Sequence, residues 1–190
     1  MNYYKKLVPI VYTQGIFGII GLFKKVVLAD GIAPFSDLAF TAAENNIILN
    51  TYEAWTGVLA YTFQIYFDFS GYSDMAVGLS LLFGIVLPFN FNSPFKAINI
   101  IDFWKRWHIT LTKLIGEYLY APITLALVRY STNRSKLIQS ICSLILPTLI
   151  TFVIIGFWHG ASWNYILFGL LHGLFIIINR LWRNINLISL

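Results

Sequence analysis

Three histidines, His108, His159 and His172, are the side chains of this sequence best suited to proton transfer. An imidazole with a reference pKa of about 6.5 can take a proton from a hydroxyl near neutral pH, which makes it a suitable general base. His159 lies in the run GFWHGASW, at the junction of two apolar stretches and among small residues that allow close approach of a backbone or a ligand. The same pattern also fits a histidine at a tight turn between two helices.

The other two histidines have different surroundings. His108 follows Lys105, Arg106 and Trp107 and shares the apolar face of a predicted helix with nearby large side chains. It could be functional, or a core histidine that hydrogen-bonds a backbone carbonyl. His172 lies in the middle of an apolar run, so we predict a role in packing or in an interhelical hydrogen bond. The spacing of the three histidines gives no HxxxH or HExxH pair, and the sequence therefore predicts no metal site.

A further polar cluster, FDFSGYSD, interrupts an apolar region with two carboxylates, Asp68 and Asp74, and two hydroxyls, Ser70 and Ser73. Polar groups at membrane depth are costly and are therefore candidates for function. The alternative is a solvated turn, or a helix break at which these side chains cap the following helix.

The composition indicates an integral membrane protein. Hydrophobic residues make up 58% of the 190 residues and charged residues only 11%, against about 25% charged in soluble domains. The net charge of +5 comes from small basic groups between apolar stretches, as in juxtamembrane segments, so nucleic acid is excluded as a partner and membrane lipid is expected. The single cysteine, Cys142, lies in an apolar run and is predicted to be a small core residue.

The chain is predicted to be all-α, a single multi-span membrane domain over residues 1–190 with re-entrant and interfacial helices. Leu7–Phe23 is a candidate span, and Asp30–Thr51 is predicted to be a loop. Trp55–Phe69 should end at Ser70–Gly71, and Met75–Leu87 is too short to cross alone. Pro88–Phe95 should be irregular, and Ile98–Tyr120 should form one amphipathic interfacial or re-entrant helix.

The two clearest spans are Leu137–Trp158 and Ser162–Ile178. The link between them is so short that they should form an antiparallel hairpin. The far ends of both spans carry arginines and a lysine, and by the positive-inside rule those ends face the cytoplasm. His159 would then lie toward the opposite side or within the bilayer.

Two stretches resemble the membrane-bound O-acyltransferase family, in particular its bacterial branch of alginate and peptidoglycan O-acetyltransferases and the D-alanyl transfer protein of teichoic acid synthesis. They are Gln64–Thr112, with FDFSGYSDM and FWKRWH, and Gly156–Gly173, with WHGASW. Gly21–Pro34 is also similar to a segment of the alginate-type members. The chain departs from many relatives at Gly116-Glu117, which precede the YLY block where those relatives have Arg-Asp.

The resemblance implies that His159 is the catalytic residue and that His108 is a second essential histidine, within a multi-helix fold that surrounds a tunnel. It further implies an acyl donor such as acetyl-CoA or another acyl thioester, with no resident cofactor, and a polysaccharide acceptor. A periplasmic or surface-anchored acyl-transfer partner and a location in the cell membrane are also implied. Family members are longer than this chain, so the chain is expected to be a partial domain.

Three hypotheses follow for function. The first is O-acyl transfer, most concretely O-acetyl transfer to hydroxyls of an extracytoplasmic polysaccharide. The second is a transporter-like component of polysaccharide export without catalysis, because transporters also build sites from broken helices with buried polar groups. The third is an inactive truncated remnant.

Overall fold

The structure, a computed structural model, describes residues 15–188, and these residues contain helices, turns and loops but no strand. The prediction of an all-α protein is therefore confirmed. The chain divides into two compact units, Met1–Asn90 and Phe91–Leu190, which are described separately below. The single membrane domain stays a prediction.

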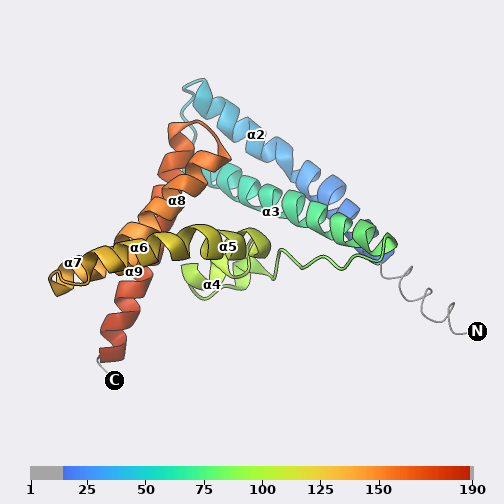
Figure 1. Ribbon diagram of the computed structural model, residues 1–190. Helices are drawn as coiled ribbons and strands as arrows, with labels where there is room; N and C mark the ends of the chain where they lie inside the picture. The colour runs from blue at the N-terminus through green and yellow to red at the C-terminus, as the bar shows by residue number, and fades with distance from the viewer. Residues whose placement is uncertain (1–14, 189–190) are drawn as a thin grey trace, which may run out of the picture. The chain divides into compact units, whose positions relative to one another are not determined.

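In the first unit, one long helical segment packs against another. Residues 15–22 are helical and continue through the π-helical η1 (Phe23–Ala29) into α2 (Asp30–Glu44). Figure 1 shows α2 running alongside α3 (Thr51–Leu82). The prediction of a loop over residues 30–51 was wrong for α2. Pro34 removes only one backbone donor, and packing against α3 outweighs that loss. The acidic residues of α2, which suggested a loop, lie on its exposed side.

The helix α3 begins at a capping box and continues past the predicted break. The backbone N–H of Glu53 donates to Oδ1 of Asn50, and the Asn50 N–H donates back to the Glu53 carboxylate. The predicted end at Ser70 and Gly71 was wrong, because Gly71 serves close packing rather than a turn. A β-carbon at Gly71 would lie 2.6 Å from the backbone oxygen of Gly21. The helix ends at Leu82, before the predicted Pro88.

The second unit opens with short helices that replace the single amphipathic helix predicted over residues 98–120. Residues 88–93 are irregular, as predicted. The backbone then turns at residues 105–108 and begins a second, longer helical segment, which is long and apolar enough to cross a membrane over Ile109–Ser131. The expectation of one interfacial or re-entrant helix over residues 98–120, rather than a full span, is therefore corrected, because a helix of membrane length begins at Ile109. Its elements are η2 (Pro94–Lys96), α4 (Ile100–Trp104), α5 (Ile109–Ile115), the π-helical η3 (Gly116–Tyr120) and α6 (Ala121–Ser131).

The two predicted C-terminal spans are confirmed as helices of membrane length. Lys136–His159 and Trp163–Arg183 are both long and apolar enough to cross a bilayer, which with Ile109–Ser131 makes three such helices among the described residues. The first runs from α7 (Lys136–Ser140) through the π-helical η4 (Ile141–Ile145) into α8 (Leu146–His159), and the second lies in α9 (Trp163–Ile188). Of the earlier predicted span over residues 7–23, residues 7–14 fall outside the described residues and residues 15–23 are helical.

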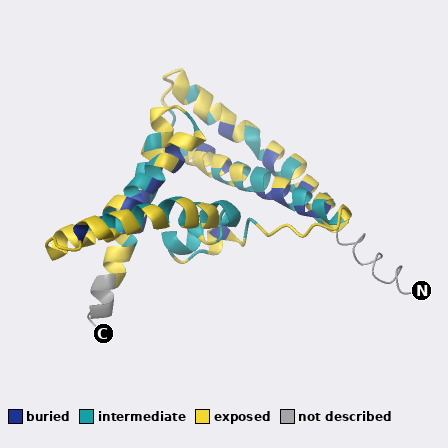
Figure 2. Cartoon of the chain, in the orientation of Figure 1, coloured by how far each residue is buried: buried dark blue, intermediate teal, exposed yellow. Residues whose placement is uncertain are grey.

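Large apolar side chains lie mostly on the surface of both units. Figure 2 shows buried positions scattered along α3 and α8 among many exposed ones. Many of the large exposed side chains are apolar: Ile48 is 97% exposed and Trp163 84% exposed. Cys142 is buried, as predicted. This distribution suits helices whose outer surface meets lipid rather than water.

Candidate active site

His159 is the last residue of α8, where a membrane-length helix ends. A link of three residues, 160–162, leads from it directly into α9. Its ring lies between aromatic side chains of both helices: the centroids of Trp158 and Phe168 are 4.9 Å and 6.1 Å away, and that of Tyr165 is 6.4 Å away. The side chain as a whole is exposed. His159 is therefore held by ring contacts at a helix end and remains accessible to a reactant within this unit.

Glycines bring α8 and α9 close enough to fix this helix end. A β-carbon on Gly156 of α8 would lie 3.0 Å from the carbonyl carbon of Tyr165, and one on Gly169 of α9 would lie 3.0 Å from that of Phe152. As residue numbers increase along α8, the numbers of the facing residues on α9 decrease, which confirms the antiparallel hairpin. Small residues at such a crossing let two backbones touch, a common basis of helix packing in membranes.

His108 occupies the turn between α4 and α5 in a left-handed backbone conformation, with φ of 42° and ψ of 57°. Such a conformation costs a residue with a β-carbon about 1 kcal/mol or more. The His108 carbonyl accepts the Thr112 N–H at 3.0 Å, which begins α5. The left-handed residue redirects the chain after α4, so His108 lies at the start of a helix. The sequence had suggested a position in the middle of one helix.

His108 lies near enough to His159 to feel its charge. Burial lowers the pKa of His108 below its ordinary value, and the positive charge that His159 can carry lowers it further. Both histidines lie in the second unit, and an influence of one charge on the pKa of the other indicates that they are not far apart. At neutral pH His108 is thus held in its neutral form, able to accept or donate one hydrogen bond at each ring nitrogen.

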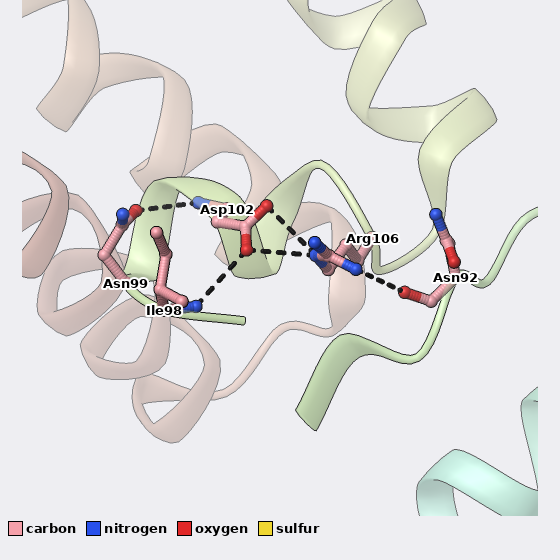
Figure 3. Close-up of polar contacts among 5 residues, drawn as sticks. All are labelled: Asn92, Ile98, Asn99, Asp102 and Arg106. Carbon is pink, nitrogen blue, oxygen red and sulfur yellow. Dashed lines mark hydrogen bonds and ion pairs between the residues drawn. The ribbon is translucent and has the colours of Figure 1, made fainter. Parts of the chain in front are cut away.

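A polar network fixes the turn that carries His108 (Figure 3). Nε of Arg106 lies 3.0 Å from both carboxylate oxygens of Asp102. Asp102 also accepts the Ile98 N–H at 3.2 Å, and its own N–H donates to Oδ1 of Asn99. Arg106 reaches Asn92 twice: its Nη1 donates to the Asn92 carbonyl, and its carbonyl accepts the Asn92 N–H. Sequence reasoning had interpreted these charges as a membrane-surface feature and missed the network.

His172 packs among rings, as the sequence predicted. Its ring centroid lies 5.2 Å from Trp104 of α4 and 4.4 Å from Phe168 of α9. Its Nδ1 is buried and finds no hydrogen-bond partner among the described residues, and the same holds for Nε1 of Trp104. The structure therefore supports the packing role and gives Nδ1 no interhelical hydrogen bond.

The FDFSGYSD cluster lies in the first unit and serves ion pairing. Nζ of Lys24 lies 2.6 Å from Asp74, and Nζ of Lys25 lies 2.7 Å from Asp68 and 2.9 Å from Asp30. These carboxylates raise the pKa of Lys25. The predicted helix break is absent, and neither carboxylate caps a helix. The pairing lysines were visible in the sequence, but only the fold brings them near the cluster.

Beside this cluster a surface cavity of about 350 Å³ is lined by Lys25, Asp68, Phe69, Tyr72 and Met75. Its single lysine is already paired with two carboxylates, so the cavity carries no net positive charge for an anion. Across residues 15–188, no three His, Cys, Asp or Glu side chains lie close enough together to hold a metal ion.

Comparison with known proteins places these blocks in one family. The family model of the membrane-bound O-acyltransferases matches residues 2–186. The chain is 51% identical over 165 residues to the peptidoglycan O-acetyltransferase of Helicobacter pylori, and 42% identical over 163 residues to the "Probable alginate O-acetylase AlgI" of Azotobacter vinelandii. It is 32% identical over 167 residues to the teichoic acid D-alanyltransferase of Bacillus subtilis.

The matches cover most of this chain but a minority of each relative. They take in 87%, 86% and 88% of the chain, and 29%, 30% and 40% of the three relatives in the same order. The matched region contains both histidine blocks and the polar cluster of α3. The chain therefore belongs to the membrane-bound O-acyltransferase family.

Proposed function

We propose that this chain forms the catalytic part of a membrane-embedded O-acyltransferase that acetylates hydroxyls of an extracytoplasmic polysaccharide. The observation that carries the proposal is the position of two histidines of the second unit, His159 at the end of a membrane-length helix and His108 in the left-handed turn that begins another. One imidazole there is exposed and the other is half-buried. Two imidazoles in such unlike surroundings can serve two different reactants.

The chemistry assigns a role to each histidine. His159 removes the proton from the acceptor hydroxyl while the hydroxyl oxygen attacks the carbonyl carbon of an acyl thioester. The carbon–sulfur bond breaks, an ester forms, and the released thiolate takes the proton back. His108, neutral and half-buried, donates a hydrogen bond to the thioester carbonyl and stabilises the charge that develops on its oxygen.

The acceptor class is suggested by the relatives' names. These names pair acetyl groups with peptidoglycan and alginate, and D-alanyl groups with teichoic acid. We accordingly propose a cell-envelope polymer as acceptor, a cytoplasmic thioester such as acetyl-CoA as donor, and the cell membrane as location. A periplasmic or surface-anchored protein that completes the transfer is part of the same proposal.

The test uses the whole protein that contains this segment, produced in cells whose polymer acetylation is measured by ester release. His159→Ala and His108→Ala should each lower acetylation by about 100-fold or more. His172→Phe is the matched control, because it removes the third imidazole and keeps an aromatic ring among its neighbours. Unchanged acetylation in both His159→Ala and His108→Ala would overturn the proposal and favour a transport function.

A further inference from the structure

We infer that Asp102 and Arg106 act as a positioning pair for His108, holding the turn that aims its imidazole at the acyl donor. The inference rests on the proposed function, since it concerns how one residue of that site is oriented. Neither side chain needs to touch a reactant. Both act through the backbone between α4 and α5.

The carboxylate of Asp102 ties the entrance of α4 to its exit. It accepts the N–H of Ile98, two residues before the helix, and pairs with Arg106, two residues after it. A helix of five residues has too few internal hydrogen bonds to persist unaided. The Asp102 carboxylate therefore supplies the connections that keep α4 folded and fix where it stops.

The guanidinium of Arg106 then joins this helix to the preceding loop. Its Nη1 donates to the Asn92 carbonyl at 3.3 Å (Figure 3). Its backbone carbonyl accepts the Asn92 N–H at 3.0 Å. Since Nε is occupied by Asp102, the arginine bonds two segments at once. A lysine has one nitrogen and no rigid fork, so it cannot hold both segments in this geometry.

The pair is shielded enough to hold its geometry. The Arg106 and Asp102 side chains are 30% and 23% exposed. Arg106 also lowers the pKa of Asp102 below its ordinary value, so this carboxyl stays ionised at neutral pH. An ion pair with several supporting hydrogen bonds and little contact with water is better defined than a flexible surface pair.

Ring contacts of Trp107, the residue before His108, hold the same turn in place. Trp107, which follows Arg106, lies against two rings, with centroids 5.1 Å from Phe91 and 5.7 Å from Phe103. Arg106, held by Asp102 and Asn92, precedes Trp107, and His108 follows it. The His108 backbone is in the left-handed conformation and forms the turn between α4 and α5. A small rotation of the peptide before it would therefore change the direction in which the imidazole points.

The experiment is a double-mutant cycle in the whole protein, with acetyl transfer measured as kcat and as KM for the thioester donor. Asp102→Asn, Arg106→Lys and Arg106→Gln are made in two backgrounds, unsubstituted and His108→Gln. Lys105→Gln is the matched control, since it removes the same charge from the neighbouring exposed side chain, which forms no ion pair with any described residue. Thermal stability in detergent is measured for every variant.

A positioning role predicts a specific pattern. In the unsubstituted background each pair variant should lower kcat by about 10- to 100-fold, because misplacement of a catalytic group by about 1 Å has that effect. Lys105→Gln should leave kcat unchanged. In the His108→Gln background the same pair variants should lower kcat by less than a further factor of about two, because the residue through which they act is already lost.

Two results would overturn the inference. One is an equal loss of kcat from the pair variants in both backgrounds, with a matching loss of thermal stability, which indicates a general structural role. The other is full activity in Arg106→Lys and Arg106→Gln. Failure of the proposed function looks different, because His108→Gln itself would then leave acetyl transfer unchanged.

Discussion

Nζ of Lys24 lies 2.6 Å from Oδ2 of Asp74, and this ion pair joins positions 50 residues apart in the first unit. The two side chains are 24% and 18% exposed, so the pair is shielded from water on most sides. It crosses the contact between the N-terminal helical segment and α3, near the close approach of Gly21 and Gly71. The ion pair and the glycine contact hold the same two helices together.

Breaking this pair should destabilise the first unit. Lys24→Met leaves the Asp74 carboxylate partly buried without its cation, and we expect a loss of about 1–3 kcal/mol, between the values for surface and for buried pairs. The measurement is thermal unfolding in detergent, followed by circular dichroism. Lys25→Met is the control: its side chain is 41% exposed and should produce a smaller shift. Equal shifts in both variants would contradict the expected role of Lys24.

Gly156 should tolerate no larger side chain. Gly156→Ala places a methyl group against the Tyr165 backbone, which cannot move as a flexible side chain could. Overpacking of this kind costs about 1–3 kcal/mol, and we also expect reduced acetyl transfer because the end of α8 carries His159. Gly116→Ala is the control, since the structure offers open space there and alanine favours helix. It should leave the melting temperature unchanged or raise it.

His172→Phe should preserve both fold and activity. The phenyl ring keeps the contacts with Trp104 and Phe168 and removes a buried nitrogen that finds no partner in the described part of the chain. Replacing an unsatisfied buried polar group by an apolar one of similar shape is nearly neutral or stabilising. His172→Ala, in contrast, should cost about 2 kcal/mol or more through the cavity it leaves. Loss of acetyl transfer in His172→Phe, with normal melting, would assign this residue to the reaction.

Stability should fall in mild acid because of His108. Its pKa is lower in the folded protein than the ordinary 6.5, mainly because of burial. The unfolded chain therefore binds the proton more tightly, and stability decreases as the pH falls below about 6.5. Above that pH the residue is neutral in both states and contributes no further change. Melting temperatures between pH 8 and pH 5 should show a shallower decline in His108→Gln than in the unsubstituted protein, and parallel curves would contradict this account.

The sequence predicted the elements whose signals are long and local. The apolar runs on either side of His159 are close to membrane length and are separated by three residues, so a helical hairpin was the only compact solution. The irregular residues 88–93 were equally clear from their Asn and Pro content. In both cases the deciding information lies within a short stretch of chain.

The errors arose where tertiary contacts decide the local structure. Pro34 and the acidic residues of α2 predicted a loop, but packing against α3 keeps the segment helical. Gly71 predicted a break, but it faces Gly21 across a helix contact. The amphipathic pattern over residues 98–120 predicted one helix and could not show that the left-handed residue His108 divides it.

The assignment of His159 and His108 to the site stays a prediction, and the residues that support the His108 turn were not predicted from the sequence. The Asp102–Arg106 network depends on Asn92, 14 positions from Arg106 and beyond the reach of any helical periodicity. The partners of Asp68 and Asp74 are likewise distant in sequence. Charged residues in a membrane protein point to function or to pairing, and the distinction becomes visible only when the fold shows their neighbours.

The π-helical segment η3 carries a side-chain contact with α9. Tyr120, at the end of η3, accepts a hydrogen bond from Nη1 of Arg180 at 3.2 Å, and the guanidinium lies over its ring. A π-turn holds one residue more than an α-turn, and each residue of an α-helix advances the azimuth by about 100°. Deleting one residue from η3 would thus replace the π-turn by an ordinary α-turn and leave the following side chains of α6 close to their present azimuth. The same deletion within the regular winding of α6 would turn every later side chain by about 100°.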